Sequence, residues 1–267
     1  MAVALRTAIG DARSGAIPSA DVRPRAAIVA GLGRIEARRL VRHPTFWLGT
    51  AFGLTLTRGV VGAGSGSSGS TTLAWLAGGL ALGMLVGTLL SANVAALRSR
   101  RDRTGELYGS LPSPPEARTL GLLTGLAVGP VTIAIVLAAV AWAVFSRTEG
   151  LAEHTDLFLA VQYPLAVFAL GAIGVGVARW IPTLLGGPII VVLHTMTPLI
   201  WLVPWILPTT SEVHATWHMI YLVAVPVTWV ALALARDRRT LIRFAVAAAA
   251  LALGIVAAVQ QTPPGGY

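Results

Sequence analysis

Long apolar stretches alternate with short polar ones along the chain, and this pattern predicts seven membrane spans. The stretches lie at 45–62, 71–97, 119–145, 157–178, 183–207, 218–235 and 244–260. Most of them approach or exceed the roughly 20 apolar residues that an α-helix needs to cross a bilayer. The last stretch is marginal in length, so six spans are the alternative. The predicted fold is an all-α polytopic membrane protein, a six-helix bundle with an extra C-terminal transmembrane helix.

The polar segments leave room for a single transmembrane domain over residues 30–260. Residues 1–29 are rich in Ala, Arg and Pro without a sustained apolar run, which predicts a disordered cytoplasmic tail, and 261–267 predicts a second disordered tail. Residues 30–43 predict a helix in the inner membrane interface, because Arg34, Arg38 and Arg42 recur every four residues on one face. A solvated basic tail is the alternative for this segment.

Composition agrees with the pattern and excludes several kinds of chemistry. The mean hydropathy is +0.75, 55% of the residues are apolar and 12% are charged, unlike a soluble domain. The chain has neither lysine nor cysteine. Without lysine it cannot form a phosphate-binding P-loop or a Schiff base. Without cysteine it cannot form disulfides, thiolate metal sites or a cysteine nucleophile.

The arginines predict the orientation of the chain in the membrane. All of them except Arg58 and Arg147 fall on one side of the predicted spans, and basic residues next to spans mark the cytoplasmic side. The N-terminus is therefore predicted to be cytoplasmic and the C-terminus external, in a bacterial-type plasma (inner) membrane. The net charge of +9 is explained by this rule and by anionic lipid headgroups, so nucleic acid is not an expected partner.

Two glycine stripes predict close helix packing. The second span carries Gly79, Gly83 and Gly87 at every fourth position, and the third repeats the spacing with Gly121, Gly125 and Gly129. Small residues at this spacing let another helix approach closely. Lining of a substrate path is the less favoured alternative. Pro130, directly after the second stripe, predicts a kink.

The fifth span is predicted to be broken, because it contains several prolines, among them Pro198. His194 is its only ionisable residue near the bilayer midplane, and Trp201 lies toward its outer end.

No recognisable motif supports catalysis by this chain. Glu212, His214 and His218 form the only metal-like cluster, but interfacial histidines explain it more simply. No metal site and no cofactor are predicted in the chain.

Residues 98–118 form the longest polar interval between two apolar segments. The run Arg101-Asp102-Arg103-Thr104-Gly105-Glu106-Leu107 is followed by Ser110-Leu111-Pro112 and by Arg118. Together with an interfacial helix before six or so spans, this run resembles the permease subunits of type 2 ATP-binding-cassette (ABC) exporters. The spacing around Gly105 and Glu106 is shorter than in that family, and the run 244–260 is an addition to its six-span plan.

The resemblance implies that the loop contains the coupling helix, which docks on a separate ATPase dimer that binds ATP and Mg²⁺. The implied docking residues are Arg100, Arg101, Asp102, Arg103, Gly105, Glu106 and Leu107. It also implies a second permease copy, or a related permease, as partner. By analogy the substrate would be a hydrophobic small molecule, a peptide antibiotic or a lipid. The resemblance also implies that the second and fifth spans line the translocation path. The candidate path residues are therefore Gly79, Gly83, Gly87, His194, Pro198 and Trp201.

Two other classes of function stay open at this point. The chain could be a membrane anchor or sensor subunit that moves nothing, or a secondary carrier that uses His194 as its ion-coupling group. A carrier usually buries acidic residues in its spans. Here every Asp and Glu falls outside the confident apolar cores, so the exporter permease is the favoured interpretation.

Overall fold

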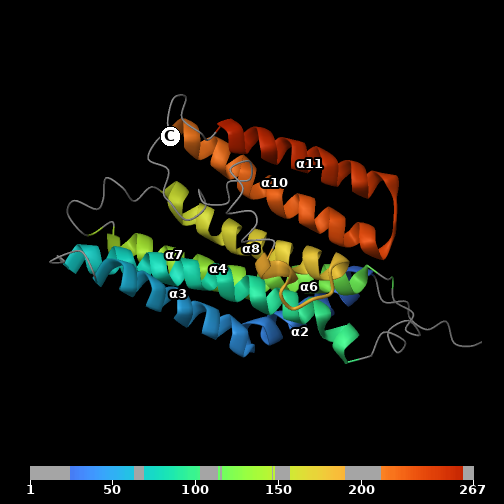
Figure 1. The fold of residues 1–267 in the computed structure, drawn as a ribbon, viewed down its shortest axis with the longest axis horizontal. Helices are drawn as coiled ribbons and strands as arrows, with labels where there is room; N and C mark the ends of the chain where they lie inside the picture. Colours follow the sequence, from blue (N-terminus) through green and yellow to red (C-terminus); the bar gives the residue numbers. More distant parts are fainter. Residues whose placement is uncertain are drawn as a thin grey trace, which may run out of the picture.

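The computed structural model describes residues 25–62, 69–102, 114, 116–145, 147, 157–189 and 212–260. All secondary-structure elements among these residues are helices, and none of these residues forms a strand (Figure 1). The labelled helices are α2 (Arg25–Arg42), α3 (Pro44–Gly62), α4 (Gly69–Arg101), α6 (Ala117–Val128), α7 (Pro130–Phe145), α8 (Leu157–Trp180), α10 (Glu212–Asp237) and α11 (Leu241–Gln260).

Four of the helical segments are long and apolar enough to cross a membrane. They are Ala117–Val140, Val161–Trp180, Thr216–Asp237 and Leu241–Gln260. This is the composition of an α-helical, multi-pass membrane protein. Helices α3 and α4 coincide with the first two predicted spans, whereas residues 190–207 of the fifth predicted span lie outside the described residues.

Helix α8 occupies the centre of the bundle. Figure 1 shows α10 and α11 on one side of it and α3 and α4 on the other, and α8 packs against α4, α6, α7 and α10. Every residue from 171 to 178 is buried. Glycines on different faces of α8 permit this packing, because a Cβ at Gly174 would lie 2.7 Å from the Leu89 carbonyl oxygen and one at Gly176 2.7 Å from the Trp229 ring.

The third predicted span is two helices, α6 and α7, that meet at Gly129 and Pro130. Gly129 N–H still donates to the Gly125 carbonyl at 2.9 Å, but Pro130 has no N–H to continue the series. The predicted kink at Pro130 is thereby confirmed.

The first glycine stripe packs α4 against α3. A Cβ at Gly83 would lie 2.3 Å from the Thr50 carbonyl oxygen, and one at Gly87 would lie 2.3 Å from the Phe46 carbonyl oxygen. A larger side chain at either position would push the two backbones apart. The prediction of close helix packing is confirmed here.

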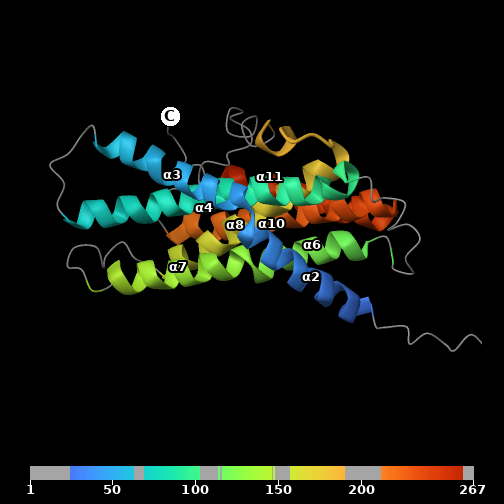
Figure 2. The ribbon, with the colours of Figure 1, turned by 90° about the horizontal axis from the view of Figure 1, so that it is seen from below.

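The second glycine stripe holds α2, the helix predicted at 30–43. A Cβ at Gly121 would lie 2.6 Å from Leu32 Cβ, and one at Gly125 would lie 2.8 Å from Glu36 Cβ. Helix α2 begins at Arg25 and runs alongside α6 (Figure 2). Its arginines at 34, 38 and 42 are exposed, as predicted for an amphipathic helix, while Gly33, Ala37 and Leu40 on its other face are buried.

Candidate functional site

The arginines that flank the spans come together at one end of the bundle. Here α4, α8 and α10 end and α6 and α11 begin, so segments far apart in the sequence meet around the loop 98–118 (Figure 1). We call this region the arginine-rich end. Because the middle of the loop lies outside the described residues, its two roots, at Arg98–Asp102 and Glu116–Thr119, define the candidate site.

The first root is tied to α2 through a carboxylate. Arg98, near the end of α4, donates to Glu36 Oε2 at 3.3 Å, and Arg39 donates to Glu36 Oε1 at 3.0 Å. Arg98 and Glu36 are 62 positions apart in the chain. The contact therefore links the end of α4 to the middle of α2.

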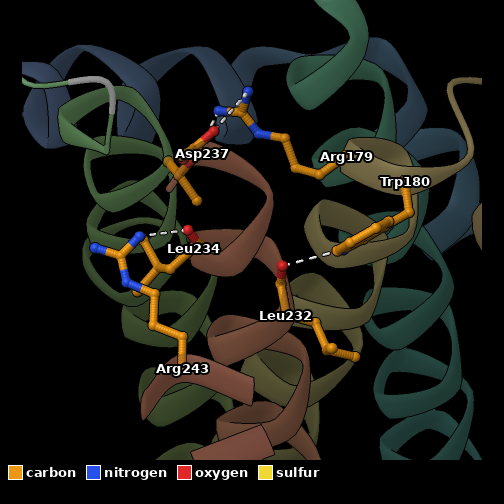
Figure 3. Close-up of polar contacts among 7 residues, drawn as sticks. Arg179, Trp180, Leu232, Leu234, Asp237 and Arg243 are labelled. Carbon is orange, nitrogen blue, oxygen red and sulfur yellow. Dashed lines mark hydrogen bonds and ion pairs between the residues drawn. The ribbon is translucent and has the colours of Figure 1, made fainter. Parts of the chain in front are cut away.

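The second root is tied to α11. Arg243 donates to Glu116 Oε1 at 2.9 Å and also to the Leu234 carbonyl oxygen at 2.5 Å. The hydrogen bond from Arg243 holds the pKa of Glu116 below its usual value, although partial burial acts in the opposite direction. Glu116 is therefore ionised at neutral pH. Figure 3 shows Arg243 against the Leu234 carbonyl, and its second contact, to Glu116, bridges α10 and α11 to the start of α6.

A largely buried pair links the same root to α8 and α10. Arg179 lies 3.7 Å from Asp237 Oδ1 and donates to Thr119 Oγ1 at 2.5 Å, while the Thr119 hydroxyl donates to Asp237 Oδ2. The side chains of Arg179 and Asp237 are only 19% and 10% exposed. Figure 3 shows the arginine at the end of α8 pointing at the last residue of α10.

The same close-up shows a second link between α8 and α10. The Trp180 indole N–H donates to the Leu232 carbonyl oxygen at 3.0 Å (Figure 3), and the Arg236 guanidinium lies 5.6 Å from the centre of the Trp180 ring. An aromatic ring that binds a cation and a carbonyl suits a membrane interface, where one side of the ring is apolar and the other polar. Trp180 thus fixes how the ends of α8 and α10 are aligned.

Both roots of the loop are therefore anchored, each to a different part of the bundle. The contacts of Arg98 lead to α2, and those of Glu116 and Thr119 lead to α8, α10 and α11. A displacement of the loop relative to the bundle would act on these helices directly. We refer to Glu116, Thr119, Arg179, Asp237 and Arg243 as the anchor cluster.

The predicted docking residues fall only partly in the described region. Arg100 and Arg101 end α4, Asp102 follows in a turn, and all three side chains are exposed. Arg103, Gly105, Glu106 and Leu107 lie outside the described residues. The three described side chains are thus accessible at the surface of the arginine-rich end.

The predicted translocation path is also only partly described. Gly79 is buried, and Gly83 and Gly87 are covered by the backbone of α3, which favours helix packing over a path for these glycines. His194, Pro198 and Trp201 lie outside the described residues.

A polar residue inside the second span was missed by the sequence analysis. Asn93 is fully buried on α4, and its side-chain N–H₂ donates to the carbonyl oxygens of Leu184 at 2.7 Å and Thr183 at 3.4 Å. Its carbonyl oxygen Oδ1 has no hydrogen-bond partner within the described part of the chain. A single asparagine in an apolar segment is the signal that could have identified it, because such groups hydrogen-bond across helices.

Apolar hollows lie on either side of α8, and the smaller one reaches Arg243 at the arginine-rich end. The larger, of about 590 Å³, lies between α7 and α8 and includes Val131, Ile135 and Trp142. The other, of about 480 Å³, lies between α8, α10 and α11. Leu165 and Phe168 line both, so they form the ridge that separates them.

The metal-like cluster of the sequence is not assembled in the described region. His218 is buried on α10, and the side chains of Glu212 and His214 lie outside the described residues. Among the residues that the structure describes, no group of three or more His, Asp or Glu side chains could hold a metal ion.

Comparisons with protein-family models, with curated proteins and with solved structures find no match. A function for the chain must therefore be inferred from the arrangement of its own residues.

Proposed function

We propose that the chain is the membrane-spanning permease subunit of an ATP-driven exporter of the type 2 ABC kind. The observation that carries the proposal is the loop 98–118, whose two roots are anchored to separate helices. A loop that only connected two spans would need no such contacts. A loop that receives force from another protein needs them, because without them the force would move the loop alone.

The length of α4 supports this role. It has 33 residues, which at 1.5 Å per residue make a helix about 50 Å long. The hydrocarbon core of a bilayer is about 30 Å thick. Arg98, Arg100 and Arg101 lie at one end of α4, so this end would extend beyond the bilayer into the aqueous phase, where a soluble ATPase could reach it.

In the proposed cycle the energy comes from the partner. Two ATPase subunits, which hold ATP and Mg²⁺, would dock on the loops of two permease chains and approach each other when ATP binds. Arg98 would pass this movement to α2 through Glu36, and Glu116 and Thr119 would pass it to α8, α10 and α11. The resulting tilt would open a path between the two permeases toward the outside.

The substrate class follows from the resemblance and is an analogy. A hydrophobic small molecule, a peptide antibiotic or a lipid would be moved outward. In this arrangement the N-terminus is cytoplasmic, the C-terminus is external, and the membrane is a bacterial-type plasma membrane.

Affinity purification of the full chain in a mild detergent tests the proposal. We expect a near-stoichiometric ATPase subunit and ATP hydrolysis in the eluate. A variant with Arg100→Gln, Arg101→Gln and Asp102→Asn should lose both, because these exposed side chains form the described part of the docking site. The control is Arg147→Gln, which removes an exposed arginine outside the arginine-rich end.

A pure chain without an ATPase subunit would contradict the proposal and favour a membrane anchor or sensor. Flux driven by an ion gradient in ATP-free vesicles would favour a secondary carrier. Retention of the ATPase by the triple variant would overturn the docking site while leaving the exporter function in place.

A further inference from the structure

A basic hollow lies where α2 meets α3. It has a volume of about 420 Å³ and is open to the surface. Its lining residues are Arg38, Arg39, Arg42, His43, Pro44 and Arg98. Residue 44 begins α3, so the hollow lies at the level where the first predicted span starts.

Positive charge in the hollow exceeds negative charge. The carboxylate in contact with it, Glu36, already accepts hydrogen bonds from Arg39 and Arg98. Arg38 and Arg42 form no ion pair with a carboxylate among the described residues. Since the hollow has four guanidinium groups and only two of them are paired with a carboxylate, it suits an anion.

His43 is held in its neutral form at this site. Its Nδ1 atom accepts the Thr45 backbone N–H at 3.3 Å and lies 2.6 Å from the Thr45 hydroxyl. Burial and the neighbouring positive charge of Arg98 lower the pKa of His43. The imidazole therefore lines the hollow without adding charge to it, and the arginines supply its positive charge.

An apolar stripe leads from the hollow along α3. Pro44, Leu48 and Phe52 are four residues apart, so they share one face of the helix. All three are exposed, with Leu48 at 67% and Phe52 at 54%. The indole of Trp47 donates to the Val41 carbonyl oxygen at 2.8 Å and fixes the bend beside this stripe. A charged hollow is thereby joined to an apolar track that enters the first predicted span.

We infer that the hollow binds the phosphate headgroup of an anionic phospholipid, with an acyl chain along Leu48 and Phe52. Arginine is suited to the headgroup, because its planar fork donates to two phosphate oxygens at once. An acidic protein surface or free phosphate would match the arginines but would leave the apolar stripe uncovered. The bound lipid would hold α2 at the membrane surface. This inference requires a membrane protein and does not depend on an ATPase partner.

Native mass spectrometry of the full chain in neutral detergent tests the inference. Dioleoylphosphatidylglycerol and dioleoylphosphatidylcholine are titrated separately onto the wild type and two double variants. In Arg38→Gln/Arg42→Gln we expect the affinity for phosphatidylglycerol to fall at least about tenfold, because two charge-assisted hydrogen-bonding groups are lost. In Arg238→Gln/Arg239→Gln, which removes two exposed arginines at the same end, we expect a change below about twofold.

A second variant tests the apolar half of the site. Leu48→Ser/Phe52→Ser should weaken phosphatidylglycerol binding and leave the weaker binding of glycerol 3-phosphate unchanged. Arg42→Lys should bind phosphatidylglycerol with intermediate affinity, since it keeps the charge and loses the planar fork. Size-exclusion profiles and helical content should match the wild type in every variant that is scored.

Three results would overturn the inference. Equal weakening in both arginine double variants would mean that overall charge, and not the hollow, attracts the lipid. Displacement of phosphatidylglycerol by an equal concentration of inorganic phosphate would make free phosphate the ligand. No preference of the wild type for phosphatidylglycerol over phosphatidylcholine, combined with loss of a co-purifying protein in Arg38→Gln/Arg42→Gln, would make the hollow a protein contact.

Discussion

The anchor cluster and the basic hollow both depend on arginine, but the arginines of the two regions differ in their partners. In the anchor cluster Arg179 faces Asp237 and Arg243 faces Glu116, so each arginine has its own carboxylate. In the basic hollow Arg39 and Arg98 share Glu36, and Arg38 and Arg42 have no carboxylate partner among the described residues. Matched charges bind helices of the same chain to one another. Unmatched charges remain available to a ligand.

Burial separates the two regions as clearly as charge does. Asp237 is 10% exposed, whereas the side chain of Arg39 is 53% exposed. Removing one partner of a buried pair leaves a charge without compensation, while an exposed charge is solvated by water. Substitutions in the anchor cluster should therefore affect stability first, and substitutions in the hollow should affect binding first.

The largest effect is expected from Asp237→Ala. It leaves Arg179 buried without its carboxylate and removes the acceptor of the Thr119 hydroxyl, which should lower the free energy of unfolding by about 3–5 kcal/mol. Arg39→Ala, at the exposed pair with Glu36, should cost less than about 1 kcal/mol. Unfolding of both variants in mixed micelles of increasing SDS content measures the difference. Equal losses would contradict the division between the two regions.

A smaller effect is expected from Gly125→Val. This substitution acts on α2, which packs on α6 and carries most of the arginines of the hollow. The new side chain would meet Glu36 and the backbone of Ala37, so α2 should separate from α6 at a cost of about 1–3 kcal/mol. Trypsin cleaves after arginine, and cleavage after Arg38 should become faster. Gly31→Val is the matched control, because a Cβ at that position would meet no atom within 4 Å.

Faster cleavage in both glycine variants would mean that helix composition, and not packing on α6, protects α2. Unchanged cleavage in Gly125→Val would mean that the stripe on α6 does not hold α2. In either case the packing of α2 on α6 would not be what shapes the hollow.

The next prediction concerns the carboxylate of the hollow. Glu36→Gln removes its negative charge, so the affinity for phosphatidylglycerol should rise several-fold, as expected for about 1 kcal/mol of repulsion removed. Stability should change by less than about 1 kcal/mol, because the ion pairs of Glu36 are partly exposed. Glu36→Asp serves as control and should leave the affinity near that of the wild type. A lower affinity in Glu36→Gln would mean that Glu36 is needed to position the arginines.

The sequence was sufficient to predict the helices but not their partners. Hydrophobic runs of about 20 residues located α3, α8, α10 and α11, and Pro130 located the break between α6 and α7. These features depend on each segment alone. The stripe at Gly121 and Gly125 predicted close packing correctly, but nothing in its spacing indicated that α2 would occupy it.

The contacts within the candidate site were even harder to predict from the sequence. Arginines beside spans could be recognised one by one, because the orientation rule is a property of single segments. The pairing of Arg179 with Asp237, or of Arg243 with Glu116, depends on which helix ends meet. A single sequence does not contain that information. Likewise, the hollow requires α2, α3 and α4 to converge, and its unequal charge is visible only once Glu36 is seen to be shared.

The smallest expected effect is a difference in pH dependence between the two regions. The pKa of Glu116 is lowered in the folded protein, so its contribution to stability is complete above the pKa of the unfolded chain, about 4.5. It is lost as the pH falls through the lower folded value. The stability difference between the wild type and Glu116→Gln should therefore be largest at neutral pH and shrink at more acidic pH. The basic hollow responds through His43 instead, whose pKa is lowered, so that its imidazole gains positive charge only at acidic pH. Unfolding of both proteins in the same detergent at pH 7 and pH 4 measures the first effect, and a difference that stays constant would show that Glu116 does not stabilise the fold through its charge.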